Sequence, residues 1–409
     1  MQAAAARPFQ LLASDGPKSF TARVLAKIAR HLQPQTPNML VATSDASGVD
    51  FTEPAPWAEH PWEVTHPHPH LAWIMSPPGK ESGGHQNLFR FIDFAEKAGY
   101  RCSILLYTAN GPQASITEVR SMLASTDAYP EINASIAIYD SETGVGPGVD
   151  AIVATGWETA YPAFADHSLA RRLYFVQDFE PSFYPTGSES LFAENTYRFG
   201  FFGITAGGWL ASKLHNEYGM QTEKFDFAVD PTIYNLTNRE PRTEAFFYAR
   251  PVTARRAFDF GITALTDFAR LKPDVTINLA GWNVSNWHVP FKYRNLASLE
   301  ITELNPLYNR CAVGLVLSLT NMSLLPLELM ASGVAPVVND GPNNRMVSDN
   351  PYIEFVPPSP LAIARRMAEV VDRPDAVERS IAMSASASSR DWNASGVQFV
   401  SALDKALRG

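Results

Sequence analysis

Short apolar runs alternate with amphipathic stretches along most of this chain. Uninterrupted apolar runs at Leu71–Met75, Cys102–Tyr107 and Ala151–Thr155 have the length of strands, and continuous apolar runs are typical of strands whose two faces are both covered. Between the first two, residues 89–100 place apolar side chains at helical spacing and end near Gly99, as a helix does. Together with similar runs at 134–139, 173–177 and 202–205, they predict a parallel sheet covered by helices.

A second series of the same kind follows the turn-rich segment 230–244. Its expected strands are 245–249, 276–281, 312–318, 335–339 and 353–356, and its expected helices include 254–271 and 323–333. The repeated β-α-β-α order predicts the α/β class, with two facing Rossmann-like doubly wound domains and a cleft between them.

The domain boundaries follow from these two series. Residues 1–235 form the N-terminal domain, in which 1–65 is a lead-in segment, and residues 236–385 form the C-terminal domain. Residues 386–409 form a last amphipathic helix, which we expect to pack back on the N-terminal domain.

Composition narrows the function classes. The 409 residues carry a net charge of −9, which disfavours a nucleic-acid partner. Cys102 and Cys311 lie in apolar runs and are expected to be buried free thiols. Because the chain shows neither a signal-peptide pattern nor an 18-residue uncharged apolar run, we predict a cytoplasmic protein.

Two features near the N-terminus each have two readings. The amphipathic segment Ser19–His31 contains several basic residues and is either a helix packed on its own domain or a peripheral contact with the inner face of the cell membrane. His66, His68 and His70 alternate with prolines. Since no carboxylate or cysteine accompanies them, we favour a stiff lead-in to a strand over a metal site.

The segment 323–333 carries the first candidate binding residues. A helix that begins after a strand presents free N–H groups to a phosphate, here those of Ser323, Leu324 and Leu325. Glu328 lies one turn further on and can accept hydrogen bonds from ribose hydroxyls. The alternative is a core helix with an exposed carboxylate.

Four further residues follow the strand at 173–177. Asp178 and Glu180 come directly after its end, where a carboxylate can orient an acceptor hydroxyl or a donor sugar. Phe183 and Tyr184 can supply an apolar platform for a sugar ring. A loop held only by local hydrogen bonds is the competing interpretation.

Basic and glycine residues complete the candidate chemistry. Arg250 leaves the first strand of the second series, and Arg255 and Arg256 begin the next predicted helix; Arg256 has the alternative of pointing to solvent. Gly83 and Gly84 permit close approach of the backbone at a helix start. The next residue, His85, is a candidate partner for a donor phosphate or an acceptor.

The sequence from Glu328 to Gly333, ELMASG, resembles the end of the E-x7-E helix pattern of glycosyltransferase family 4. Thr320 stands where that pattern has its first glutamate. The variant TNMSLLPLE, together with QDFEPSFYP within Tyr174–Ser190, resembles a subgroup of bacterial rhamnosyltransferases of O-antigen and S-layer glycan synthesis. The resemblance covers about residues 70–370.

This resemblance implies a retaining GT-B glycosyltransferase, in which residues 1–235 would bind the acceptor and residues 236–385 the nucleotide sugar. Its donor would be dTDP-L-rhamnose, and its acceptor a growing bacterial surface polysaccharide or a lipid-linked glycan. Arg250 and Arg255 would contact the diphosphate and, with Asp178, act in catalysis. No cofactor or metal would be required, since protein cations would carry the leaving-group charge. Another nucleotide sugar, a sugar-nucleotide epimerase or phosphorylase, and a non-catalytic glycan-binding module remain open, as does the oligomeric state.

Overall fold

A computed structural model describes residues 39–60, 64, 67–80, 82–110, 112–322, 324–388 and 391–408. The segment Ser19–His31, His66 and Ser323 lie outside the described residues. The chain divides into two compact units, Met1–Leu40 and Val41–Gly409, and the account below concerns the second. No helix in the described ranges is long and apolar enough to cross a membrane.

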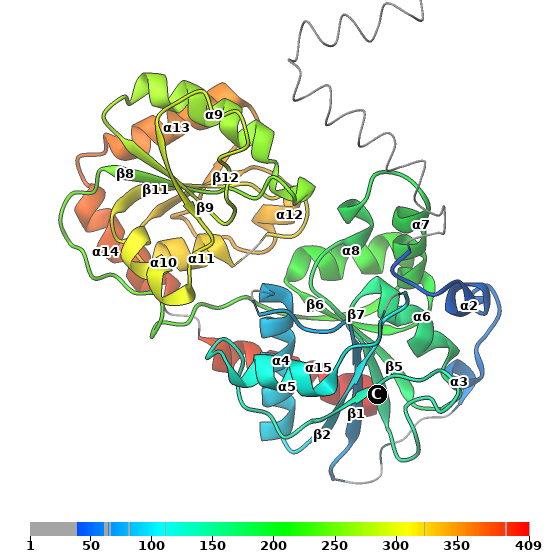
Figure 1. Cartoon of the computed structure of the whole chain (residues 1–409). Helices are drawn as coiled ribbons and strands as arrows, with labels where there is room; N and C mark the ends of the chain where they lie inside the picture. Colours follow the sequence, from blue (N-terminus) through cyan, green and yellow to red (C-terminus); the bar gives the residue numbers. More distant parts are fainter. Residues whose placement is uncertain are drawn as a thin grey trace, which may run out of the picture. The chain divides into compact units, whose positions relative to one another are not determined.

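The first half of this unit is built on a seven-stranded parallel sheet (Figure 1). The strand order is β3-β2-β1-β4-β5-β6-β7, so the chain starts near the middle, runs to one edge and then returns to the other side of β1. The central strands are almost wholly buried because their sequences are apolar apart from the first residues of β1 and β5, His70, Arg171 and Arg172. The strand bounds are β1 His70–Met75, β2 Arg101–Leu106, β3 Ser135–Ile138, β4 Ala151–Ala154, β5 Arg171–Val176, β6 Phe202–Ala206 and β7 Gln221–Phe225.

A helix lies between most pairs of consecutive strands, as parallel strands require, because the chain has to cross back before each new strand begins. Among these helices, α4 packs against β2, α6 against β4, and α8 against β6 and β7. The bounds are α2 Thr43–Ser47, α3 Pro56–Glu59, α4 Gly83–Lys97, α5 Ile116–Ala124, α6 Trp157–Ala165, η1 Glu180–Phe183, α7 Ser188–Asn195, η2 Thr196–Arg198 and α8 Gly208–Tyr218.

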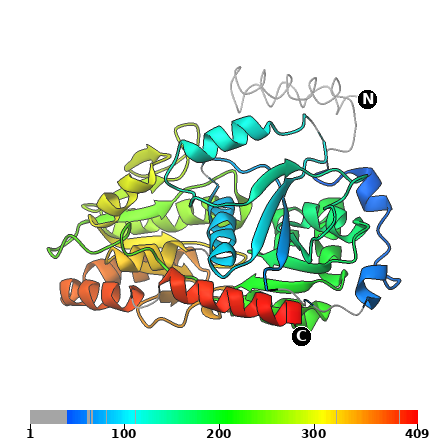
Figure 2. The ribbon, with the colours of Figure 1, turned by 90° about the horizontal axis from the view of Figure 1, so that it is seen from below.

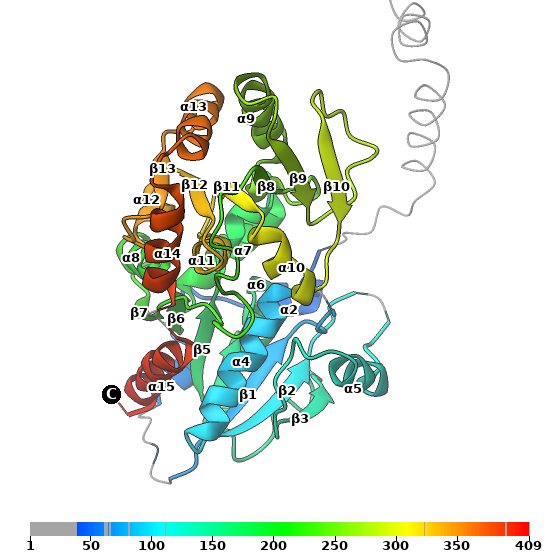
Figure 3. The same cartoon turned by 90° about the vertical axis from the view of Figure 1, so that its left-hand side faces the viewer.

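The second half is built on a six-stranded parallel sheet in the order β10-β9-β8-β11-β12-β13. Figures 1 and 3 show α9 and α13 on one face of this sheet, and α10, α11 and α14 on the other. The strand bounds are β8 Glu244–Tyr248, β9 Thr276–Ala280, β10 Tyr293–Ala297, β11 Cys311–Val316, β12 Ala335–Asn339 and β13 Glu354–Val356. The helix bounds are η3 Ala254–Arg256, α9 Phe258–Leu271, α10 Ile301–Tyr308, α11 Leu325–Ala331, α12 Pro342–Arg345, α13 Pro360–Val371, α14 Ala376–Ala387 and α15 Trp392–Arg408.

Gly314 sets the distance between α11 and the sheet. A Cβ atom at Gly314 would lie 2.6 Å from Cδ1 of Leu329, closer than van der Waals contact allows, and Leu329 is fully buried. The absence of a side chain on β11 therefore lets α11 approach closely, which fixes the position of Glu328 on that helix.

The last helix, α15, packs against α4, β6 and β7 of the first half (red in Figure 2). Its fully buried Phe399 lies 4.9 Å from the ring centroid of Phe91 on α4 and 5.9 Å from that of Phe175 on β5. An aromatic cluster in the first half thus includes a residue from the far end of the chain.

The predicted helix 254–271 is wrong at its start. Ala254–Arg256 form a short 3-10 turn, Ala257 takes a left-handed conformation with φ 48°, and the α-helix begins only at Phe258. Arg255 and Arg256 therefore belong to a turn before the helix. The edge strands β7 and β10 were not predicted, because their partly exposed, polar-containing sequences lack an apolar run.

Candidate active site

The carboxyl ends of β8 and β11 are the natural place for a ligand in the second sheet. From β8 the chain proceeds to β9 and β10 on one side, and β11 then begins the other side. Open parallel sheets bind ligands where the strand order reverses in this way. The loop after β8 carries the three candidate arginines, and the loop after β11 runs from Leu317 to α11.

The three arginines are held close to one another by different partners. The Nη1 atom of Arg250 donates to the hydroxyl of Tyr248 at 3.2 Å, and Nη1 of Arg256 donates to Oγ of Ser318 at 3.1 Å. Burial lowers the pKa of Arg256, and the neighbouring charges of Arg255 and Arg250 act in the same direction, against the effect of Asp178. Arg256 thus lies within the cluster, and the alternative that it points to solvent is wrong.

Asp178 brings a carboxylate from the end of β5 to this cluster. Its Oδ2 forms an ion pair with Nε of Arg255 at 3.2 Å and accepts a hydrogen bond from Oγ1 of Thr320 at 3.0 Å. Its Oδ1 accepts from the backbone N–H of Asn321 at 2.8 Å. A carboxylate therefore does lie at Thr320, where the glycosyltransferase family 4 pattern has glutamate, but it comes from the first sheet.

Gln177 and Asn321 extend the network to the start of α4. The side-chain amide of Asn321 donates to the backbone carbonyls of Gln177 at 3.1 Å and Ala206 at 2.8 Å. The side-chain amide of Gln177 in turn donates to the carbonyl of Gly84 at 3.1 Å. These bonds join Gly84, Asp178 and the loop after β11 into one hydrogen-bonded group.

Gly83 and Gly84 form the exposed first turn of α4. A Cβ atom would meet nothing within 4 Å at Gly83 and only Nε2 of Gln177, at 3.6 Å, at Gly84. Packing within the protein therefore does not require glycine at either position. Space is left for a ligand to approach the backbone there.

His85 has both ring nitrogens engaged inside the protein. Its Nδ1 lies 2.7 Å from Oγ of Ser82, and its Nε2 lies 3.0 Å from the backbone carbonyl oxygen of Ser76. Burial lowers the pKa of His85, so the neutral ring donates from Nε2 to the carbonyl and accepts from the serine hydroxyl. These two hydrogen bonds fix the His85 ring against the start of α4.

Glu328 lies on α11 with no hydrogen bond from its carboxylate to any described residue. Burial raises its pKa to about 7, against the opposing effect of Arg90 on α4. The carboxylate also interacts electrostatically with Tyr234 and Tyr308. Leu324 and Leu325 begin the same helix. An uncommitted acidic group with a raised pKa is suited to receive hydroxyl donors from a ligand.

The residues expected to bind an acceptor have several internal partners. The buried Glu180 carboxylate accepts from the backbone N–H of Trp157 at 2.6 Å and from the hydroxyl of Tyr174 at 2.9 Å. The hydroxyl of Tyr184 accepts from Nε1 of Trp157 at 2.9 Å. The Arg255 guanidinium stacks on the ring of Phe183, with its Cζ atom 4.1 Å from the centroid of that ring. These contacts shape the loop and support the arginine.

Several residues of the site were missed from the sequence. Three asparagines, one at the end of β12 and two just after it, donate to the carbonyl of Ser318 at 2.9, 3.0 and 3.3 Å and so hold the loop after β11: Asn339, Asn343 and Asn344. The available signal was the asparagine-rich segment NDGPNN, which begins at the last residue of a predicted strand. Arg90 and Asn321 carried no comparable signal, because their importance comes from contacts between distant parts of the chain.

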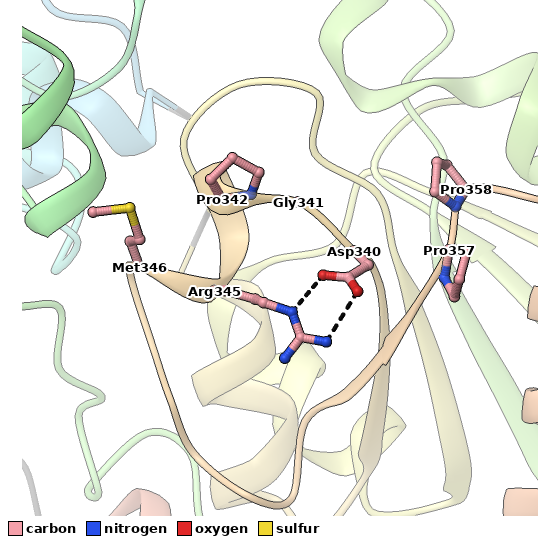
Figure 4. Close-up of a pocket in the computed structure, with 7 residues that line it drawn as sticks. All are labelled: Asp340, Gly341, Pro342, Arg345, Met346, Pro357 and Pro358. Atoms are coloured by element: carbon pink, nitrogen blue, oxygen red, sulfur yellow. Dashed lines mark hydrogen bonds and ion pairs between the residues drawn. The ribbon is translucent and has the colours of Figure 1, made fainter.

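A pocket of about 530 Å³ opens at the carboxyl ends of β12 and β13 (Figure 4). Arg345 forms an ion pair across it with Asp340, at 2.5 Å between Nε and Oδ1. Its other lining residues are Gly341, Pro342, Met346, Pro357 and Pro358. It lies at the same sheet edge as Arg250, Arg255 and Arg256, but none of these three lines it.

Histidines and carboxylates do not assemble into a metal centre in the part of the chain that the structure describes. No group of three or more His, Cys, Asp or Glu side chains there is arranged to hold an ion. His68 contacts the carbonyl of Gly99 at 2.9 Å, whereas His70 contacts Oγ of Ser103 at 3.0 Å.

Comparison with known sequences gives two domain matches and one curated relative. Residues 243–368 match the family model "WsaF, C-terminal domain", and residues 140–206 match "WsaF, N-terminal domain". The O-antigen biosynthesis protein RfbC of Myxococcus xanthus is 32% identical over 308 aligned residues, and the match covers 73% of this chain. They make up only 24% of RfbC, so the chain spans about a quarter of that relative.

Solved structures resemble this chain over most of its length. Anabaena HepE in complex with UDP and glucose has a TM-score of 0.62 at 14% identity, covering 83% of this chain and all of that one. A variant of S. aureus TarM with UDP has a TM-score of 0.64 at 9% identity, with the same coverage. A UDP-N-acetylglucosamine 2-epimerase from Listeria monocytogenes, described as putative, has a TM-score of 0.53 at 9% identity, covering 83% of this chain and 96% of that one.

Identities this low establish architecture only. The two parallel sheets, their strand orders and these structural likenesses show that the chain has the GT-B fold, with stretches in both halves that resemble the two domains of WsaF.

Proposed function

We propose that this protein is a glycosyltransferase that takes a sugar from a nucleoside diphosphate donor and attaches it to a glycan acceptor. The observation that carries the proposal is the charge at the reversal point of the second sheet. Three guanidinium groups lie there, and among the described residues the only carboxylate that pairs with one of them is that of Asp178. Positive charge in excess of the paired carboxylate is suited to bind a diphosphate.

The leaving nucleotide gains negative charge as the glycosidic bond to the donor breaks. Arg250 and Arg255 neutralise that charge in our proposal. The buried Arg256, which is bonded to Ser318, adds to the positive potential of the site without contacting the diphosphate. Because these groups are held before the donor arrives, little reorganisation is needed during the reaction. The backbone N–H groups at Leu324 and Leu325, and at Gly83 and Gly84, would add uncharged donors.

Glu328 and Asp178 have separate roles. The uncommitted carboxylate of Glu328 receives the ribose hydroxyl of the nucleoside. Asp178, already fixed by Thr320, Asn321 and Arg255, orients the transferred sugar or the acceptor hydroxyl. A carboxylate held from three sides loses little entropy when substrate binds, which favours a positioning role.

For the donor we propose dTDP-L-rhamnose, transferred with retention of configuration. The motif resemblance at Glu328–Gly333 and 174–190 supports this choice, and so do the matches to both WsaF domains. The proposed acceptor is a growing surface polysaccharide or a lipid-linked glycan, in line with the name of the curated relative. A protein working on such acceptors would be cytoplasmic and would contact the inner face of the membrane.

The direct test is transfer from dTDP-L-rhamnose by wild type and by Arg250→Ala. Removal of one diphosphate donor group should lower kcat/KM by a factor that corresponds to about 2–4 kcal/mol. Arg270→Ala is the matched control, because Arg270 is exposed on α9 and pairs only with Asp267. Equal activity of Arg250→Ala and Arg270→Ala would remove Arg250 from the donor site.

The same assay checks the proposed metal independence. Turnover should persist in EDTA because arginines and backbone amides take the place of a divalent cation. Loss of turnover that magnesium or manganese restores would contradict this part of the proposal.

A further inference from the structure

Two aromatic residues lie at the carboxyl ends of the neighbouring strands β8 and β9. Tyr248 is the last residue of β8 and is paired with Ala280, the last residue of β9. The pairing continues past the strands, because the N–H of Ala249 donates to the carbonyl of Ala280 at 2.8 Å. Arg250 and Trp282 each follow this pair by two residues, so the backbone brings them side by side.

Gly281 makes room for the Tyr248 ring. Its φ of 111° lies in the left-handed region that favours glycine. A Cβ atom at this position would lie only 2.6 Å from Cε2 of Tyr248. The ring therefore packs directly against the backbone of Gly281, and its hydroxyl accepts the 3.2 Å hydrogen bond from Nη1 of Arg250.

The guanidinium of Arg250 is held on its edge by Tyr248 and on its face by Trp282. Its Cζ atom lies 5.8 Å from the centroid of the Trp282 ring, within the range of a cation–π contact. The backbone is fixed as well, because the carbonyl of Arg250 accepts from the N–H of Thr253 at 3.0 Å. In the part of the chain that the structure describes, Tyr248 is the only hydrogen-bond partner of this guanidinium, and no carboxylate pairs with it.

Arg255 is held in a different way. It stacks on Phe183 but also pairs with Asp178, so part of its charge is already compensated. Tyrosine and tryptophan side chains are neutral, and they can fix the edge and the face of a guanidinium while its full charge remains for an anion. The Trp282 ring is 36% exposed, so this part of the site is open to solvent.

We infer that Tyr248 and Trp282 are positioning residues, which hold Arg250 in place for the donor diphosphate without neutralising it. The inference rests on the proposed function, because it requires the diphosphate to bind at Arg250. Loss of either aromatic group would let the guanidinium rotate away. The cost should then appear in nucleotide binding, and only while Arg250 is present.

The test is a double-mutant cycle, in which calorimetric titration measures the dissociation constant for dTDP. With Arg250 present, Tyr248→Phe should weaken binding about threefold to tenfold, and Trp282→Leu about threefold. Trp282→Phe should cost less, since it keeps an aromatic face. In the Arg250→Ala background, Tyr248→Phe and Trp282→Leu should have no further effect, because the group through which they act is missing.

Tyr352→Leu is the matched control. Tyr352 stacks with Arg379, whose guanidinium already pairs with Glu354, so this variant should bind dTDP as wild type does. Thermal melts show whether each variant is folded.

The outcomes separate the inference from the proposed function. Losses of affinity that are equally large with and without Arg250, or no loss in either background, overturn the positioning role and leave the transferase proposal standing. If Arg250→Ala binds dTDP as tightly as wild type, or wild type does not bind dTDP, the proposed diphosphate site is wrong, and the inference with it.

Discussion

The environment of Glu328 in the ligand-free protein disfavours the ionised form of its carboxyl group. Around it lie Arg90, Tyr234 and Tyr308, of which only the arginine favours ionisation. In the folded protein its pKa is about 7 in place of 4.5. Between these two values the folded state binds more protons than the unfolded state, so the residue lowers stability as pH rises through that window.

Binding and stability should therefore respond to pH in opposite directions. The affinity of wild type for dTDP should fall as pH drops below about 7, approaching tenfold per pH unit, because only the ionised carboxylate is a strong acceptor. Calorimetric titrations at several pH values measure this. Glu328→Gln is the control, because its remaining pH dependence reports the titration of dTDP itself.

The same variant tests the stability side. Without ligand, Glu328→Gln should be more stable than wild type at about pH 8, by up to about 3 kcal/mol, and the difference should shrink towards pH 5. Denaturant unfolding at both pH values gives the comparison. A carboxylate that serves only the fold would show the reverse, with the glutamine variant less stable at the higher pH.

At the scale of elements, the start of α4 has glycine where its packing does not need it. Replacing Gly83 by alanine meets no protein atom within 4 Å and removes backbone freedom from the unfolded chain, so the free energy of unfolding should stay equal or rise by up to about 1 kcal/mol. If the donor or acceptor approaches this turn, the new methyl group obstructs it.

We therefore expect Gly83→Ala to lower kcat/KM about tenfold or more while its melting temperature is maintained. Steady-state kinetics and a thermal melt on one preparation are sufficient. Unchanged kinetics would show that the substrate does not reach the first turn of α4.

How well an element could be predicted depended on its burial. The strands of both sheet centres were predicted, because strands covered on both faces contain long apolar runs. The edge strands β7 and β10 were not, and the turn at Arg255 and Arg256 was taken for a helix. Nothing in the residue types around Ala257 signals the left-handed conformation that delays the start of α9.

The candidate site was only partly accessible from the sequence for a similar reason. Asp178 and Arg250 were predicted from their positions at strand ends and Arg255 from the family resemblance, and an ion pair joins Asp178 to Arg255. That Asp178 reaches Thr320, 142 residues later in the chain, is a property of the tertiary structure alone. The engagement of Glu180 by Trp157 and Tyr174 was likewise not visible in the sequence.

At the scale of the whole molecule, α15 contributes to the core of the first half. Phe399 is fully buried among Trp73, Phe91 and Phe175. Phe399→Ala should lower the free energy of unfolding by about 3–5 kcal/mol. Val397→Ala on the same helix, where the valine is 70% exposed, should change it by less than about 0.5 kcal/mol. Equal stabilities of the two variants would contradict the packing of α15.

The position of Phe399 also determines when, during synthesis on the ribosome, the core of the first half can be completed. Domains of a growing chain usually fold in the order in which they emerge, and β1 to β7 are all synthesised before β8. Their aromatic cluster nevertheless lacks one ring until α15 has left the exit tunnel. During most of translation, apolar surface on α4 and β5 therefore stays uncovered, and a chaperone that shields nascent chains would find its binding site there.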